Sequence, residues 1–245
     1  MKQSAVLVTG ASRGIGRATA ERLASSGRFV VGLARSPGDG AFPGYFHAVD
    51  LEDREATGAA LEVVTERFEF SGLVNNMGFN IGQPLETLDL ATFERIVDLN
   101  VRTSIQCALA VLPGMRERRK GRIVNVSSRA LLGREGHSSY SAAKAALIGL
   151  TRTWALELAP HGITANVVAP GQTATEMFRK ANLIDSGAPR GRPLEYYTNR
   201  IPMRRLGDPD EIASAIEYFL SDGAAYVTGQ VLYVCGGLSI GNVAP

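Results

Sequence analysis

Short apolar runs alternate along the chain with longer stretches in which apolar residues recur at helical spacing. Most of the runs lack the strict polar–apolar alternation of a half-exposed strand, which is typical of strands covered on both faces. The expected strands are 5–9, 29–34, 45–49, 72–75, 122–127, 163–168 and 231–234. The expected helices are 15–26, 54–68, 90–118, 139–158 and 209–220.

This repeated strand–helix order predicts an α/β fold, namely a single doubly wound, Rossmann-type parallel sheet of about seven strands with helices on both faces. Such a sheet binds its ligand in the crevice at the carboxyl ends of the strands. The chain has 245 residues, so residues 1–245 are expected to form one domain. Residues 176–205 depart from this alternation of strands and helices because they contain no clear strand. We expect there a lid or substrate loop, with a mobile surface excursion as the alternative.

Composition narrows the classes of function. The formal net charge is +2 and no long basic block is present, which argues against a nucleic-acid partner. No apolar run approaches the roughly 20 residues that span a bilayer, and the first residues do not form a signal peptide, so we expect a cytoplasmic protein without a membrane partner. The two cysteines, Cys107 and Cys235, fit no CxxC pattern, and the three histidines are scattered, so no metal site is expected.

A glycine-rich segment, VTGASRGIG at residues 8–16, lies between the first expected strand and the first expected helix. Glycines allow a tight turn and a close approach of the backbone to a pyrophosphate, and the helix N-terminus offers free N–H groups and a positive dipole end. The position of the segment makes it a dinucleotide-binding loop rather than a plain turn. Its expected cofactor contacts are Gly10, Ser12, Arg13, Gly14, Ile15 and Gly16.

The end of the second expected strand bears on the choice of dinucleotide. A carboxylate there would favour NAD, but the sequence reads Leu33-Ala34-Arg35-Ser36. Arg35, together with Arg13 in the glycine loop, could bind a 2′-phosphate through charge-assisted hydrogen bonds. We therefore expect NADP(H) rather than NAD(H), with two solvated surface arginines as the alternative.

Tyr140 and Lys144 lie four residues apart in an expected helix, so both side chains lie on one face. A phenol titrates near pKa 10. A neighbouring ammonium, together with the positive nicotinamide of an oxidised cofactor, would lower that pKa toward the range of useful acid–base catalysis. The strand before this helix ends in two hydroxyls, Ser127 and Ser128, where a parallel sheet builds its site. One of these serines could polarise a carbonyl oxygen.

Together these motifs resemble the short-chain dehydrogenase/reductase family nearly end to end. Residues 9–16 resemble its TGxxxGxG loop, and residues 75–78 (NNMG) its NNAG element. Asn100, Ser128, Tyr140 and Lys144 resemble its catalytic tetrad. The resemblance implies that Tyr140 donates the proton in reduction, Ser128 polarises the carbonyl, Lys144 binds the nicotinamide ribose, and Asn100 holds a relay water. It implies further cofactor contacts at Asp50, Leu51, Asn76, Gly78, Tyr140, Lys144, Pro170, Gly171, Thr173 and Thr175.

Three positions depart from the family pattern. Met77 replaces an alanine, and Cys235 stands where aspartate is usual. The interval from Ser128 to Tyr140 is one residue short, while counting from Ser127 restores the usual spacing. We prefer Ser128 because a deletion fits the following loop, and Ser127 stays open as the alternative.

The substrate is less constrained, because one scaffold serves many substrates. The resemblance is closest to 3-oxoacyl-acyl-carrier-protein reductases, with sugar, polyol, steroid and small-ketone dehydrogenases as alternatives. A basic patch could dock an acidic carrier protein or form a solvated face, and consists of Arg116, Arg118, Arg119 and Lys120. A cofactor sensor without turnover is the remote alternative, since it would not need the tetrad. The family resemblance also implies a homotetramer with two-fold axes.

Overall fold

Each of the seven expected apolar runs forms a strand in the computed structural model, which describes residues 2–183 and 191–241. The strands are β1 (Gln3–Thr9), β2 (Val30–Ala34), β3 (Tyr45–Ala48), β4 (Phe68–Asn75), β5 (Gly121–Val126), β6 (Ile163–Pro170) and β7 (Val231–Val234). They form one parallel sheet in the order β3-β2-β1-β4-β5-β6-β7. The chain thus winds outward in one direction from β1 and in the other from β4. The ligand crevice of a doubly wound sheet lies where these two directions separate.

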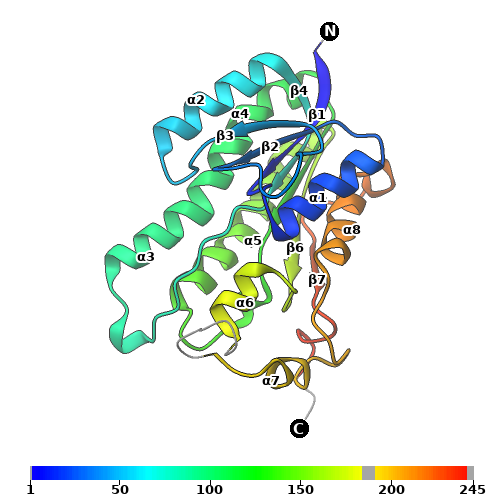
Figure 1. The fold of residues 1–245 in the computed structure, drawn as a ribbon. Coiled ribbons are helices and arrows are strands. Elements are labelled where there is room, and N and C mark those ends of the chain that lie inside the picture. The colour runs from blue at the N-terminus through cyan, green and yellow to red at the C-terminus, as the bar shows by residue number, and fades with distance from the viewer. Residues whose placement is uncertain (1, 184–190, 242–245) are drawn as a thin grey trace.

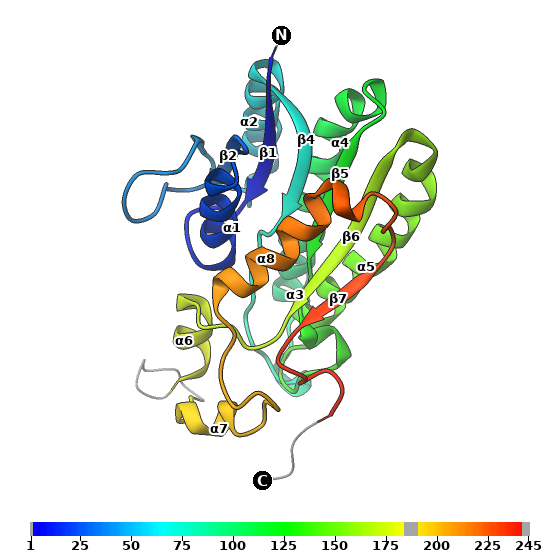
Figure 2. The same ribbon diagram turned by 90° about the vertical axis from the view of Figure 1, so that its right-hand side faces the viewer.

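Helices cover both faces of the sheet, as the sequence predicts (Figures 1 and 2). The described helices are α1 (Gly14–Ser25), α2 (Arg54–Arg67), α3 (Leu90–Val97), α4 (Thr103–Glu117), α5 (Ser138–Leu158), α6 (Glu176–Asn182), α7 (Leu194–Thr198) and α8 (Pro209–Leu220). Helices α1 and α8 pack on one face, and α2, α4 and α5 on the other. Helices α6 and α7 lie beyond the carboxyl ends of the strands (Figure 1).

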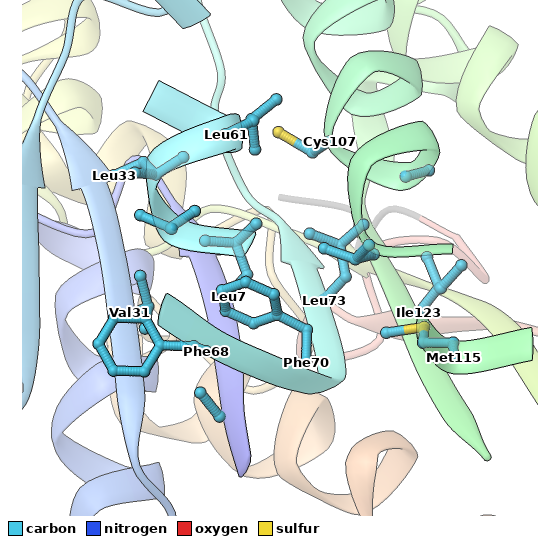
Figure 3. Close-up of a cluster of buried hydrophobic side chains, with 14 of the residues drawn as sticks. Leu7, Val31, Leu33, Leu61, Phe68, Phe70, Leu73, Cys107, Met115 and Ile123 are labelled. Atoms are coloured by element: carbon cyan, nitrogen blue, oxygen red, sulfur yellow. The ribbon is translucent and has the colours of Figure 1, made fainter. Parts of the chain in front are cut away.

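Two apolar cores explain why the strands read as continuous apolar runs. Along β1, Ala5 and Leu7 face the core beneath α2 and α4, while Val6 and Val8 face the core beneath α1 and α8. Figure 3 shows the first core, where Leu7 packs among side chains from the neighbouring strands and from α2 and α4. Because successive side chains of a strand point to opposite faces, a strand buried on both faces needs apolar residues at every position.

Two expected elements differ from the structure. The helix expected at 90–118 is present as one continuous helical run, but a π-helical turn at Asp98–Arg102 divides it into α3 and α4. The buried Asn100 lies in this turn, and its Nδ2 donates to the carbonyl of Ile96 at 2.8 Å and to that of Phe79 at 2.8 Å. Such turns often occur at functional sites, and apolar spacing does not reveal them.

The region expected as a loop at 176–205 contains two short helices, α6 and α7, although it forms no named strand in its described part. Thr175 begins α6 by accepting a hydrogen bond from the Phe178 amide at 3.1 Å. Residues 184–190 of this region lie outside the described residues. Its expected role as a lid stays a prediction.

None of the helices formed by residues 2–183 and 191–241 has the length and apolar character needed to cross a membrane. Over the same residues, no group of three or more His, Cys, Asp or Glu side chains is arranged to hold a metal ion.

Candidate active site

A cavity of about 540 Å³ opens at the carboxyl ends of the strands, between the sheet and α6. It is lined from the glycine loop at one end to Tyr140 and Lys144 at the other. The expected cofactor residues that line it are Gly10, Ser12, Arg13, Gly14, Ile15, Arg35, Asp50, Leu51, Asn76, Gly78, Tyr140, Lys144, Pro170, Gly171, Thr173 and Thr175. Ser127 and Ser128 also line it, whereas Gly16 and Asn100 do not.

The glycine loop has the shape of an anion cradle. Gly10 and Gly14 adopt φ values of +63° and +54°, which side-chain-bearing residues rarely reach. Helix α1 begins at Gly14 with no side-chain cap and no acidic residue in its first turn. Its first N–H groups are therefore left for a ligand, and the positive end of the helix dipole favours an anion there. These features fit the pyrophosphate of a dinucleotide.

Gly16 acts behind the loop rather than in the cavity. A Cβ at this position would lie 2.2 Å from the Gly10 carbonyl oxygen and 2.5 Å from Asn76 Nδ2. Asn76 Nδ2 itself donates to the carbonyls of Thr9 at 3.0 Å and Gly10 at 3.2 Å. Thr9 Oγ1 accepts from the amides of Asn76 at 3.1 Å and Met77 at 3.0 Å. These bonds tie the glycine loop to the end of β4, and the sequence analysis did not identify the part that Thr9 plays.

Two basic side chains line the cavity near the glycine loop and the end of β2. Arg35 is exposed directly after β2, and Arg13 is 58% exposed and forms an ion pair with Glu176 at 2.9 Å. Acidic groups share this region: Asp39, which the sequence analysis did not single out, also lines the cavity. Glu52 lines it as well, and its pKa is lowered, mainly by its hydrogen bond from Arg95 and further by nearby positive charge that includes Arg35.

Lys144 is held rigidly at the other end of the cavity. Its side chain is 2% exposed, and its Nζ donates to the carbonyl of Val126 at 3.0 Å. The Nζ lies 5.7 Å from the centre of the Tyr140 ring, so the expected pair shares one site. Burial lowers the pKa of Lys144 to about 8, because water that would stabilise the ammonium is excluded.

The pKa of Tyr140 moves in the direction opposite to the one the sequence argument expects. Burial raises the pKa of its hydroxyl, while a hydrogen bond with Ser128 and the charge of Arg134 act against this rise. In the protein itself, removal from water outweighs the neighbouring charge. The lowering expected from Lys144 together with the positive nicotinamide of the oxidised cofactor stays a prediction.

The two serines have different surroundings. Ser127 is buried, and its Oγ donates to the carbonyl of Lys144 at 2.7 Å, inside the hydrogen-bonded framework. Ser128 is half-buried, contacts Tyr140, and accepts a hydrogen bond from the Ala130 amide at 3.1 Å. Only the hydroxyl of Ser128 is thus paired with the tyrosine that the sequence singles out.

Asn100 lies behind the site. It is 1% exposed, and its Oδ1 accepts from the Phe79 amide at 3.3 Å. A Cβ at Gly78 would lie 3.6 Å from Lys144 Nζ and 3.8 Å from Asn100 Oδ1, so the bare glycine separates the two side chains. The expected relay water at Asn100 stays a prediction.

The remaining expectations concern residues outside the tetrad. Cys235 packs its Cα 2.7 Å from where a Gly171 Cβ would stand, and its Sγ contacts Ser239 Oγ at 3.2 Å, which indicates a structural role in this turn. In the basic patch, Arg118 lies 3.4 Å from Glu69, and Lys120 lies 3.1 Å from Asp222.

Comparison with known proteins gives consistent matches. The family model described as enoyl-(acyl carrier protein) reductase matches residues 10–239. The 3-oxoacyl-(acyl-carrier-protein) reductase FabG of Vibrio cholerae is 39% identical, with 95% of this chain and 96% of that protein covered. The aldohexose dehydrogenase structure from Thermoplasma acidophilum has a TM-score of 0.89 at 33% identity and covers 100% of this chain and 96% of its own. A putative NAD(P)-dependent gluconate 5-dehydrogenase from Beutenbergia cavernae, with bound NADP, has a TM-score of 0.87 at 30% identity, with 96% of each chain covered.

Proposed function

The chain belongs to the short-chain dehydrogenase/reductase family of nicotinamide-dependent oxidoreductases, and from this premise we propose that it transfers a hydride between NADP(H) and a carbonyl or alcohol substrate. One observation carries the proposal. The anion cradle around Gly10 and Gly14 and the Ser128–Tyr140–Lys144 group line the two ends of one cavity. A dinucleotide whose pyrophosphate lies in the cradle would place its nicotinamide toward Tyr140.

The bound nicotinamide supplies or accepts the hydride, and the chain's own residues move and hold the proton. In reduction, Tyr140 donates its phenolic proton to the carbonyl oxygen, on which negative charge develops. Ser128 donates a hydrogen bond to the same oxygen. Lys144 binds the nicotinamide ribose and its charge favours the phenolate that Tyr140 leaves behind, while Asn100 holds the relay water through which the proton is replaced.

The preference for NADP(H) is supported by Arg35 and Arg13, which line the adenosine end of the cavity where residues 33–36 offer no carboxylate. A 2′-phosphate would accept charge-assisted hydrogen bonds from both guanidinium groups. Arg13 would then release Glu176 and bind the phosphate instead. Losing the Arg13–Glu176 ion pair costs little free energy, because this pair is exposed.

For the substrate, we propose a 3-oxoacyl thioester, in line with the likeness to FabG. The alternative is a sugar, polyol, steroid or small ketone, and the structural likeness to aldohexose dehydrogenase favours a sugar within that group. Docking of an acidic carrier protein would use Arg116 and Arg119, because Arg118 and Lys120 already have acidic neighbours.

The test is the loss of NADPH absorbance at neutral pH with acetoacetyl-CoA, with NADH in parallel. Fast consumption selective for NADPH is the expected result. Consumption of sugars or aromatic ketones only would replace the thioester and keep the oxidoreductase. Tyr140→Phe should abolish turnover while NADPH still binds, and full turnover by this variant would contradict the assignment. A cofactor sensor would bind NADPH and reduce none of these carbonyl compounds.

We also propose a homotetramer, in which α4 and α5 pair with their copies. Large apolar side chains stand exposed on both helices, with Leu109 65% and Leu156 80% exposed. Burying such residues against a partner removes apolar surface from water. Light scattering at micromolar concentration should give four chains, and a monomeric mass would refute the assembly.

A further inference from the structure

The cavity holds an arginine that the proposed reaction does not use. Arg134 lies in the loop between Ser128 and Tyr140 and lines the cavity beside Tyr140. Its guanidinium is near enough to Tyr140 for its charge to act against the rise in the pKa of that phenol. A fixed positive charge therefore stands next to the point where the substrate carbonyl is expected.

Within residues 2–183 and 191–241, the partner of the Arg134 side chain carries no charge. Its Nη2 donates to Asn182 Oδ1, a neutral amide oxygen. Asn182 is buried, and its own Nδ2 donates to the Phe178 carbonyl at 2.7 Å, so α6 holds this oxygen in place. Among residues 2–183 and 191–241, no carboxylate forms an ion pair with Arg134. A guanidinium has five N–H donors, and a single amide oxygen satisfies only one of them.

Several other arginines of the chain have a carboxylate partner. Arg22, Arg95, Arg102 and Arg205 each form an ion pair with a carboxylate in the described structure. Arg134, by contrast, is exposed to the cavity. The neighbouring protein lowers the pKa of its guanidinium by partly shielding it from water, and Tyr197, Tyr140 and the like-charged Arg129 are the other groups that act on this pKa. An exposed guanidinium that lines a cavity and has no carboxylate partner in the described structure is available to bind an anionic ligand there.

We propose that Arg134 is a specificity residue that binds a carboxylate of the substrate while Tyr140 protonates its carbonyl oxygen. The planar guanidinium matches a carboxylate with two parallel hydrogen bonds, and Asn182 fixes the group in the orientation needed. The inference deepens the proposed function: it rests on reduction at Tyr140 and names the substrates as oxo acids, including thioesters that carry a free carboxylate.

The kinetic test compares two substrates of nearly equal size that differ in charge, acetoacetate and acetoacetamide, in the intact protein with NADPH. Wild-type protein should favour the acid in kcat/KM. Arg134→Gln should reduce the acid-to-amide ratio roughly tenfold to hundredfold, mainly through KM, because a charge-assisted pair is lost. Arg134→Lys keeps the charge without the planar group and should restore part of the ratio. A wild-type preference for the amide, or a ratio unchanged in Arg134→Gln, overturns the inference.

A matched control is Arg54→Gln on α2, whose exposed arginine pairs with Asp98 outside the cavity. Its acid-to-amide ratio should equal that of the wild type. If both arginine variants lowered the ratio equally, the effect would come from the overall charge of the protein, and the specific role of Arg134 would be wrong.

A binding measurement separates this inference from the proposed function. Calorimetric titration with hexanoate and hexanamide needs no turnover. Wild-type protein should bind the acid roughly tenfold or more tightly than the amide, and Arg134→Gln should bind the two equally. Equal binding by the wild type overturns the carboxylate site. A preference for hexanoate in a protein that reduces no carbonyl compound keeps the site and refutes the reductase.

Discussion

Replacing Ser127 and Ser128 with alanine, one at a time, separates the chemistry of the site from its framework. The sequence leaves both serines open, since Ser128 fits the loop and Ser127 fits the spacing to Tyr140. In the structure, Ser127 donates to the Lys144 carbonyl at 2.7 Å and Ser128 pairs with Tyr140. We therefore expect the two substitutions to affect different measurements.

The contacts of each serine give the expected size of its effect on stability or on kcat. In Ser127→Ala a buried neutral hydrogen bond is lost, which costs about 1 kcal/mol of unfolding free energy. For a chain of 245 residues this lowers Tm by about 2–4 °C. Ser128→Ala removes a donor to the developing oxyanion, which typically lowers kcat by about 10²–10³. It also removes the hydrogen bond that counteracts the rise in the pKa of Tyr140, so this pKa should rise further.

The assay is NADPH consumption at saturating substrate, followed on the same preparations by thermal unfolding. We expect Ser127→Ala to keep kcat within a few-fold of the wild type and to lower Tm. Ser128→Ala should lower kcat and change Tm less. Apart from its bond with Tyr140, the Ser128 hydroxyl makes one framework hydrogen bond within residues 2–183 and 191–241, the half-exposed cap to the Ala130 amide, so its loss costs little. The reverse pattern, with kcat lost in Ser127→Ala and kept in Ser128→Ala, would refute the reasoning.

Two further predictions concern charge. Arg35→Asp should weaken NADPH binding roughly tenfold to hundredfold and leave NADH binding equal or tighter, as measured by fluorescence titration. The reason is that a carboxylate repels a 2′-phosphate and accepts a hydrogen bond from a ribose hydroxyl. Unchanged NADPH affinity would make Arg35 a solvated surface group. The pKa of Lys144, about 8 in the folded protein, lies below that of an unfolded lysine. Between these two values the unfolded chain binds more protons, so stability should rise with pH from about 8 to 10.5. Urea titrations of wild type and Lys144→Met across this range test the effect, and an identical pH dependence in both would refute it.

Most of the fold could be predicted because the physical signal is local. The inner strands are largely buried on both faces, and even the partly exposed edge strands β3 and β7 keep short runs rich in apolar and aromatic residues, so each strand is visible in the sequence. The glycine loop could be predicted equally well from the sequence, because Gly10 and Gly14 occupy left-handed conformations that glycine tolerates and other residues rarely adopt. In both cases a single stretch of sequence contains the whole cause.

Features that depend on tertiary contacts could not be predicted in this way. The π-helical turn at Asp98–Arg102 follows from bonds between Asn100 and the distant Phe79. The rise in the pKa of Tyr140 in the protein itself has the same origin: sequence spacing shows the neighbouring ammonium but not the removal of the phenol from water. Arg134 carries no motif, and its role depends on Asn182 of α6.

The reacting groups and the proposed substrate-binding residue therefore differ in how far a substitution disturbs the surrounding structure. The reacting groups are fixed from within the sheet, because Lys144 is anchored on the carbonyl of Val126 in β5 and Ser127 on the carbonyl of Lys144. Altering those contacts weakens the framework that holds the reacting groups. The group that we assign to the substrate, Arg134, stands on a loop and is held by one amide from α6. A substitution there changes which substrate is bound while the proton donor keeps its position, which is why the reaction can be inferred from sequence motifs and the substrate has to be inferred from side-chain contacts.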